Sequence, residues 1–269
     1  MTFKKKYDEP DVQSNTIAEL SSRLLEANNE LKKAEADRKN MLENISHDLR
    51  APLTAIRNTI DYLKQLDNSK ESCIDPKDLT SYLNILDTRT RTLEVMVQDL
   101  YFFTRVDSGM EKMKMEDIPL GQFLEEYFFA AEVNERYNDR VLSLNIPKDY
   151  SACVMMDASK MSRVLDNLFV NALKYSDSGA SIELGAYAEN DMAFFYVKDT
   201  GEGIPEDAIE HIFDRTYRVS DSRTPETYNS SGLGLSIVRS IIDKHGGEIC
   251  CVSKVGEGSC FTVKLPLNE

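Results

Sequence analysis

Apolar side chains recur at steps of three and four along the first part of the chain. From Ile17 the series runs through Leu20, Leu24, Ala27, Leu31, Ala34, Met41 and Ile45. This spacing is typical of a two-stranded coiled coil, and only Arg38 interrupts it with a charge. After Ile45 the series steps by four to Leu49, which is a stutter that locally unwinds a coiled coil.

A second run of helical spacing follows clusters of helix breakers at 67–69 and 75–76. Its apolar positions are Leu79, Tyr82, Leu86, Leu93, Met96, Leu100 and Phe103, and Ser108–Gly109 marks its end. Two long helices with a short connection predict an antiparallel hairpin. Because one hairpin cannot bury both apolar stripes, we expect two copies to form a four-helix bundle, as a homodimer.

The pattern changes near Pro119, where short alternating runs typical of β-strands replace the long helical periods. These runs lie at 141–146, 181–188, 192–197, 247–253 and 259–265, and helical patterns are interleaved at 120–137, 159–175 and 233–244. The mixture predicts an α/β two-layer sandwich, with the sheet on one side and helices on the other. The polar stretch 206–231 is typical of a long functional loop, often a lid.

These patterns predict a multidomain α and α/β chain. Its expected domains are an N-terminal tail and coiled-coil helix at 1–37, a helical hairpin at 38–109 and the sandwich at 110–269. The chain carries 46 acidic against 32 basic residues, which argues against a nucleic-acid-binding surface. Five cysteines without a CxxC pair favour a reducing cytoplasm over a zinc site or a disulfide framework.

The sequence also bears on membrane attachment. No run of about 18 apolar residues occurs, so no segment of this sequence is expected to span a membrane. The basic cluster 4–6 fits a position just after a membrane segment, and it fits a solvated tail equally well. We expect a cytoplasmic module whose parent protein is anchored in the cell membrane.

His47 lies in the run NISHDLRAPL at 44–53. The adjacent Asp48 gives an imidazole on a helix surface a neighbouring carboxylate, which makes His47 a candidate nucleophile with its own base. Pro52 follows one turn on and has no N–H, so the carbonyl of Asp48 loses its helical partner and the helix can bend.

The run NLFVNALKYS at 167–176 places Asn167 and Asn171 on one helix face. A side-chain amide oxygen suits Mg²⁺ that carries its own waters and phosphate oxygens. Lys174 lies one turn on and can meet a phosphate. An amphipathic helix with solvated amides explains the same pattern.

Two glycine-containing runs follow. DTGEGIP at 199–205 comes directly after an apolar strand, where its glycines let the backbone approach a flat ligand and Asp199 can accept a hydrogen bond from an exocyclic amine such as that of adenine. An ordinary strand turn is the alternative. SSGLGLSIV at 230–238 opens a helix, and its glycines expose N–H groups that can cradle phosphate.

Two further runs complete the set. In IFDRTYR at 212–218, Arg215 and Arg218 could pair with nucleotide phosphates or form surface ion pairs. GEGS at 256–259 is interpreted as a hairpin turn with a structural role.

In their order and spacing, NISHDLRAPL, NLFVNALKY, DTGEGIP, IFDRTYR, GLGLSIV and GEGSCF resemble the sensor histidine kinases of two-component systems, over roughly residues 38–269. The resemblance implies a dimerisation and phosphotransfer hairpin, followed by an ATP-binding domain of the gyrase/Hsp90/histidine-kinase type. It also implies that the γ-phosphoryl group of ATP passes to His47, and then to an aspartate of a response regulator receiver domain.

The resemblance assigns roles to particular residues. His47 is implied to be the phosphoacceptor, Asp48 its base and Asn171 the Mg²⁺ ligand. The other positions implied to bind ATP are Asn167, Lys174, Tyr175, Asp199, Gly201, Gly203, Arg215, Arg218, Gly232, Leu233, Gly234 and Leu235. Two positions depart from the family pattern: Ala51 stands where Thr or Asn often serves dephosphorylation of the partner, and Ser230 replaces a lid glycine.

Two other functions use the same features. An ATPase or serine kinase on this nucleotide fold would place phosphate on a hydroxyl group instead of on His47. A dimeric signalling scaffold would bind ATP without turnover, although the chain retains His47, Asn171 and Asp199.

Overall fold

The computed structural model describes residues 12–68, 75–107, 112–214, 217 and 233–268. They belong to two compact units, Met1–Ser46 and His47–Glu269. Within the described ranges, no helix is both long and apolar enough to cross a membrane.

Two long helices form the first part of the chain, as the apolar periodicity predicts. Helix α1 spans Val12–Asn68 and α2 spans Pro76–Asp107, so both helices respect the predicted breakers. Asp75 caps the start of α2, because its carboxylate accepts a hydrogen bond from the backbone N–H of Lys77 at 2.9 Å.

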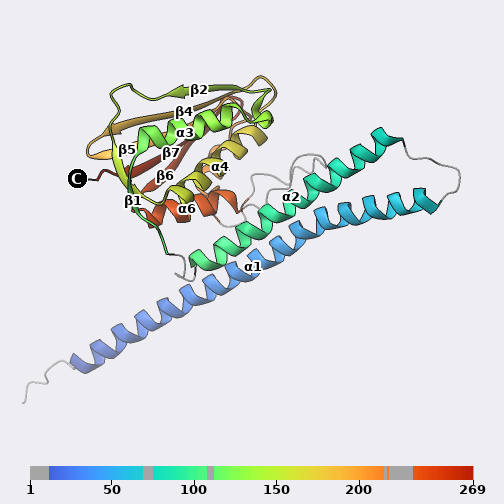
Figure 1. Ribbon diagram of the computed structural model, residues 1–269. Helices are drawn as coiled ribbons and strands as arrows, with labels where there is room; N and C mark the ends of the chain where they lie inside the picture. The colour runs from blue at the N-terminus through green and yellow to red at the C-terminus, as the bar shows by residue number, and fades with distance from the viewer. Residues whose placement is uncertain (1–11, 69–74, 108–111, 215–216, 218–232, 269) are drawn as a thin grey trace, which may run out of the picture. The chain divides into compact units, whose positions relative to one another are not determined.

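Residues 47–68 of α1 pack along α2 as an antiparallel hairpin. The two run side by side in Figure 1, and the rings of Tyr62 and Tyr82 lie 5.4 Å apart. Pro52 lies inside α1 and does not end it. The predicted hairpin is therefore confirmed.

A five-stranded sheet is the frame of the second part. Its spatial order is β2 (Val141–Asn145), β4 (Ser181–Glu189), β5 (Met192–Asp199), β7 (Gly258–Pro266) and β6 (Glu248–Lys254). Strand β2 is parallel to β4, and the other neighbouring pairs are antiparallel. One face is covered by α3 (Leu120–Glu132), α4 (Ala158–Lys174) and α6 (Gly234–Lys244), as Figure 1 shows. The predicted two-layer sandwich is confirmed.

Alternation along the strands explains why one face of the sheet is covered. On β4, Ile182 and Leu184 are fully buried, while Glu183 between them is partly exposed on the other face. Helix α4 supplies an opposing apolar stripe that includes the fully buried Leu168 and Phe169. The core therefore lies between the sheet and the helices.

Several short elements differ from the sequence predictions. Strands β1 (Glu116–Pro119) and β3 (Cys153–Met156) pair antiparallel and were not predicted, because four residues are too few to reveal an alternating pattern. The helix predicted at 120–137 ends at Glu132, and Glu135–Tyr137 forms a separate 3-10 turn.

The long loop predicted at 206–231 begins instead with a helical turn, α5, at Glu206–Ile209. Acidic residues in its first turn suit the positive end of a helix. Residues 218–232 lie outside the described part of the chain, so the functional role of that stretch stays a prediction.

A buried histidine joins the end of α6 to the start of α4. The ring of His245 bonds through Nδ1 to the carbonyl of Ile241 at 2.7 Å, and its Nε2 accepts the backbone N–H of Asp157 at 3.0 Å. The Asp157 carboxylate then caps α4 through the N–H of Lys160 at 3.2 Å. These bonds fix a neutral ring with its proton on Nδ1.

We expect His245→Ala to destabilise the sandwich by about 2 kcal/mol, because the N–H of Asp157 and the carbonyl of Ile241 lose their buried partner. The shift is measured as a change in the urea unfolding midpoint, followed by tyrosine fluorescence. His211→Ala is the matched control, since that side chain is 53% exposed. Equal shifts in the two variants would contradict the role assigned to His245.

Candidate functional site

The two predicted asparagines lie on α4 beside the start of α6. The side-chain amide of Asn167 donates to the carbonyl of Arg163 at 2.9 Å, which fixes its orientation. Its Oδ1 then faces Gly234, where a Cβ would lie only 2.7 Å from it. Asn171 follows one turn on and is half-buried. The structure therefore brings the NLFVN and GLGL runs together.

The DTGEGIP loop leaves β5 and passes directly over the end of α4. The backbone N–H of Glu202 donates to the carbonyl of Tyr175 at 2.8 Å. A Cβ at Gly201 would overlap that same carbonyl oxygen. Only glycine allows this close backbone approach, so Gly201 holds the loop against the helix end.

The Asp199 carboxyl group lies at the base of this loop and is only 4% exposed. Its Oδ1 accepts the N–H of Gly201 at 2.8 Å and the N–H of Ser259 at 3.3 Å. Burial raises the pKa of Asp199 above its usual value, and the two N–H bonds act in the opposite direction. No hydrogen bond from the described residues reaches Oδ2, which can therefore accept one from a ligand amine.

The GEGS run forms the β6–β7 hairpin turn, as predicted, and it also supports the DTGEGIP loop. A Cβ at Gly258, whose φ is 96°, would overlap the carbonyl oxygen of Asp199. The N–H of Gly256 donates to the carbonyl of Glu202 at 2.7 Å. The contact of Ser259 with Asp199 was missed from sequence, although GEGSCF was among the runs that carried the family resemblance.

Lys174 and Tyr175 form a pair at the end of α4. The Lys174 ammonium donates to the Tyr175 hydroxyl at 2.9 Å and lies 4.6 Å from the centre of its ring. Tyr175 is 47% exposed, so the pair borders solvent. Three predicted site residues, Arg215, Arg218 and Gly232, lie outside the described residues, while Leu233 is fully buried and Leu235 half-buried.

The candidate nucleophile lies on α1. His47 is 81% exposed, and its Nδ1 lies 3.7 Å from Oδ1 of Asp48, whose side chain is 12% exposed. Ala51 is exposed and Pro52 is buried. The structure therefore presents an accessible imidazole beside a largely buried carboxylate.

We expect Asp199→Asn to weaken ATP binding by about 2 kcal/mol, roughly thirtyfold, because the amide replaces the charged acceptor. A hydrogen bond from a ligand amine requires ionised Asp199, whose pKa is raised by burial. The affinity of the unmodified chain should therefore decline on acidification at a higher pH than for an ordinary aspartate. Calorimetric titration with ATP across pH tests both effects.

The exposed Asp149 provides the control, since Asp149→Asn should leave the affinity and its pH dependence unchanged. An Asp199→Asn variant that bound ATP with the original affinity would remove Asp199 from the site.

Two family models match the chain. Residues 37–109 match the model described as His Kinase A (phospho-acceptor) domain. Residues 156–269 match the model described as Histidine kinase-, DNA gyrase B-, and HSP90-like ATPase. The hairpin and the sandwich thus each match a separate model.

Similar curated proteins include the sensor histidine kinase WalK of Bacillus subtilis, 32% identical over 89% of this chain. The sensor protein KdpD of Clostridium acetobutylicum is 32% identical over 92% of it. The chain spans 38% and 27% of their respective lengths.

Solved structures show the same fold. The histidine kinase AdeS of Acinetobacter baumannii superposes with a TM-score of 0.62 at 23% identity, over 83% of this chain and 98% of that one. The histidine kinase ThkA, in complex with the response regulator protein TrrA, gives a TM-score of 0.62 at 20% identity. That match covers 97% of this chain and 68% of ThkA.

Proposed function

Because the chain belongs to the sensor histidine kinases, whose phosphoacceptor and ATPase portions it carries, we propose that it transfers the γ-phosphoryl group of ATP to His47. The phosphoryl group would then pass to an aspartate of a response regulator receiver domain. The observation that carries the proposal is the 81% exposed imidazole of His47, with the Asp48 carboxylate 3.7 Å from its Nδ1.

The geometry around His47 favours one ring nitrogen as the nucleophile. Since Asp48 lies beside Nδ1, the neutral ring attacks through Nε2. An N–P bond forms, the bond from the γ-phosphorus to the bridging oxygen breaks, and ADP leaves. As the ring becomes positive, Asp48 stabilises it and accepts the Nδ1 proton as general base.

The nucleotide site is proposed to lie between α4, the DTGEGIP loop and the start of α6. The Oδ2 atom of Asp199 would accept a hydrogen bond from the exocyclic amine of adenine. Gly201 and Gly203 would shape the loop beside the base. Lys174 lies at the α4 end where a phosphate could meet it. The positions implied to contact phosphates or shape the lid are Tyr175, Arg215, Arg218, Gly232, Leu233, Gly234 and Leu235.

The residues present fit a magnesium ion. Asn171 offers a hard amide oxygen on the half-buried face of α4, and Asn167 is oriented beside it by the bond to Arg163. Mg²⁺ neutralises charge on the transferring phosphoryl group when it is bound. We propose Asn171 as its protein ligand.

A homodimer through the hairpin is proposed because a single copy leaves large apolar side chains exposed on both helices. Leu53 is 60% exposed on α1, and Val95 is 57% exposed on α2. Covering them with a second hairpin would give the predicted four-helix bundle. We further propose that an upstream membrane sensor signals through α1, so insertions near Ala34 should alter kinase activity.

We expect labelled ATP with Mg²⁺ to place phosphate on the unmodified chain and not on His47→Gln, because only an imidazole forms the N–P bond. The bound phosphate should be lost in acid and survive in base. His211→Gln, another exposed histidine, should label normally. Equal labelling of His47→Gln, or acid-stable phosphate, would instead favour a serine kinase.

Ala51 lies one turn after His47 and has no group that can orient a water molecule. We therefore expect the chain not to accelerate loss of phosphate from its phosphorylated regulator, whereas Ala51→Thr should accelerate it at least about tenfold, as one positioned hydrogen-bonding group contributes. Release of inorganic phosphate from the isolated phosphoregulator measures this. Fast release with the unmodified chain would contradict the expectation.

A further inference from the structure

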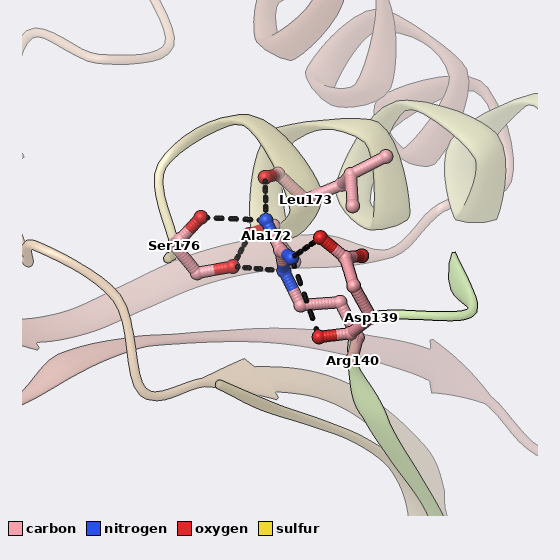
Figure 2. Close-up of polar contacts among 5 residues, drawn as sticks. All are labelled: Asp139, Arg140, Ala172, Leu173 and Ser176. Atoms are coloured by element: carbon pink, nitrogen blue, oxygen red, sulfur yellow. Dashed lines mark hydrogen bonds and ion pairs between the residues drawn. The ribbon is translucent and has the colours of Figure 1, made fainter. Parts of the chain in front are cut away.

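Arg140, which directly precedes β2, places its guanidinium at the C-terminal end of α4 (Figure 2). The side chain is only 7% exposed. Its Nη2 donates to the carbonyls of Leu173 and Ser176 at 3.2 and 2.7 Å, and its Nε donates to the Ser176 hydroxyl at 3.1 Å. Asp139 pairs with Nη1 at 2.6 Å.

These contacts supply hydrogen-bond donors to backbone carbonyl groups at the end of the helix. The last carbonyls of a helix have no intrahelical donor, and that end carries partial negative charge. The planar guanidinium reaches several acceptors at once, which a lysine ammonium cannot do in the same geometry. The Ser176 hydroxyl also donates to the carbonyl of Ala172 at 2.6 Å, so Ser176 and Arg140 together stabilise the turn that follows α4.

The two carbonyls that accept hydrogen bonds from Arg140 flank Lys174 and Tyr175 in the sequence. The Tyr175 carbonyl is the acceptor for the N–H of Glu202 at 2.8 Å, and it packs against Gly201. Gly201 in turn donates to Asp199 at 2.8 Å. Hydrogen bonds between successive stretches of backbone therefore link Arg140, through the end of α4 and the loop after β5, to the Asp199 carboxylate.

We infer that Arg140 is a positioning residue for the nucleotide site, because it fixes the end of α4 on which the Asp199 loop rests. This inference depends on the proposed ATP site and not on transfer to His47. Arg140 itself lies outside the proposed nucleotide contacts. It acts through the Tyr175 carbonyl.

The test compares Arg140→Met with Arg136→Met, a nearby exposed arginine, in the full chain. Competition against trinitrophenyl-ATP gives the affinities for ATP and for inosine triphosphate, which carries an oxygen in place of the exocyclic amine of adenine. We expect Arg140→Met to weaken ATP binding about tenfold, as for one lost charged hydrogen bond. Binding of inosine triphosphate should weaken less, so discrimination between the two should fall.

A purely structural role would lower both affinities by the same factor, through loss of folded protein. Equal factors, or an Arg140→Met affinity matching that of Arg136→Met, would overturn the inference. If Arg140→Met does not fold, Arg140→Lys and Ser176→Ala test the inference instead. Reduced discrimination between ATP and inosine triphosphate in either variant supports the positioning role of Arg140. Unchanged discrimination in both variants rejects that role. An unmodified chain that discriminates between ATP and inosine triphosphate but does not label His47 would instead contradict the proposed function alone.

Discussion

The proposed nucleotide site depends on one interaction, the contact of the Tyr175 carbonyl group with the loop that follows β5. Tyr175 is the C-cap residue of α4, and its carbonyl accepts the N–H of Glu202 and lies so close to Gly201 that no side chain fits there. One side of the proposed site is formed by the amides of α4, and the other side by the Asp199 loop. The two sides therefore meet at this one backbone oxygen. A backbone contact of this kind involves no side-chain rotamers, so the position of the helix end constrains the position of the loop.

The main elements could be predicted because their periods differ. Apolar steps of three and four distinguished α1 and α2 from the alternating strands, and Asp75 marks a helix start through its capping carboxylate. The short strands β1 and β3 were not predicted, because four residues are too few to show an alternating pattern. The candidate site residues Asn171 and Asp199 could be singled out from the sequence because of their side-chain chemistry, while the residues that support them could not.

Arg140 shows why those supports were missed. In sequence it follows Asp139, so a local surface ion pair is the natural interpretation, and that pair does exist. Its partners Leu173 and Ser176 lie 33 and 36 residues away and contribute backbone carbonyls, which every residue has. Long-range bonds to backbone groups leave no trace in residue types. The same reasoning applies to the contact of Ser259 with Asp199.

The buried state of Asp199 explains how such a site can select one base. Burial disfavours its charge, and two backbone N–H groups stabilise it through Oδ1. An adenine amine would add a third bond at Oδ2. A base that presents a carbonyl at that position would set an acceptor against a buried carboxylate, and sites that hydrogen-bond a substrate N–H discriminate strongly because the unpaired buried group is costly. Base selection therefore requires a carboxylate that is both buried and held in place, which the hairpin turn and the end of α4 together provide.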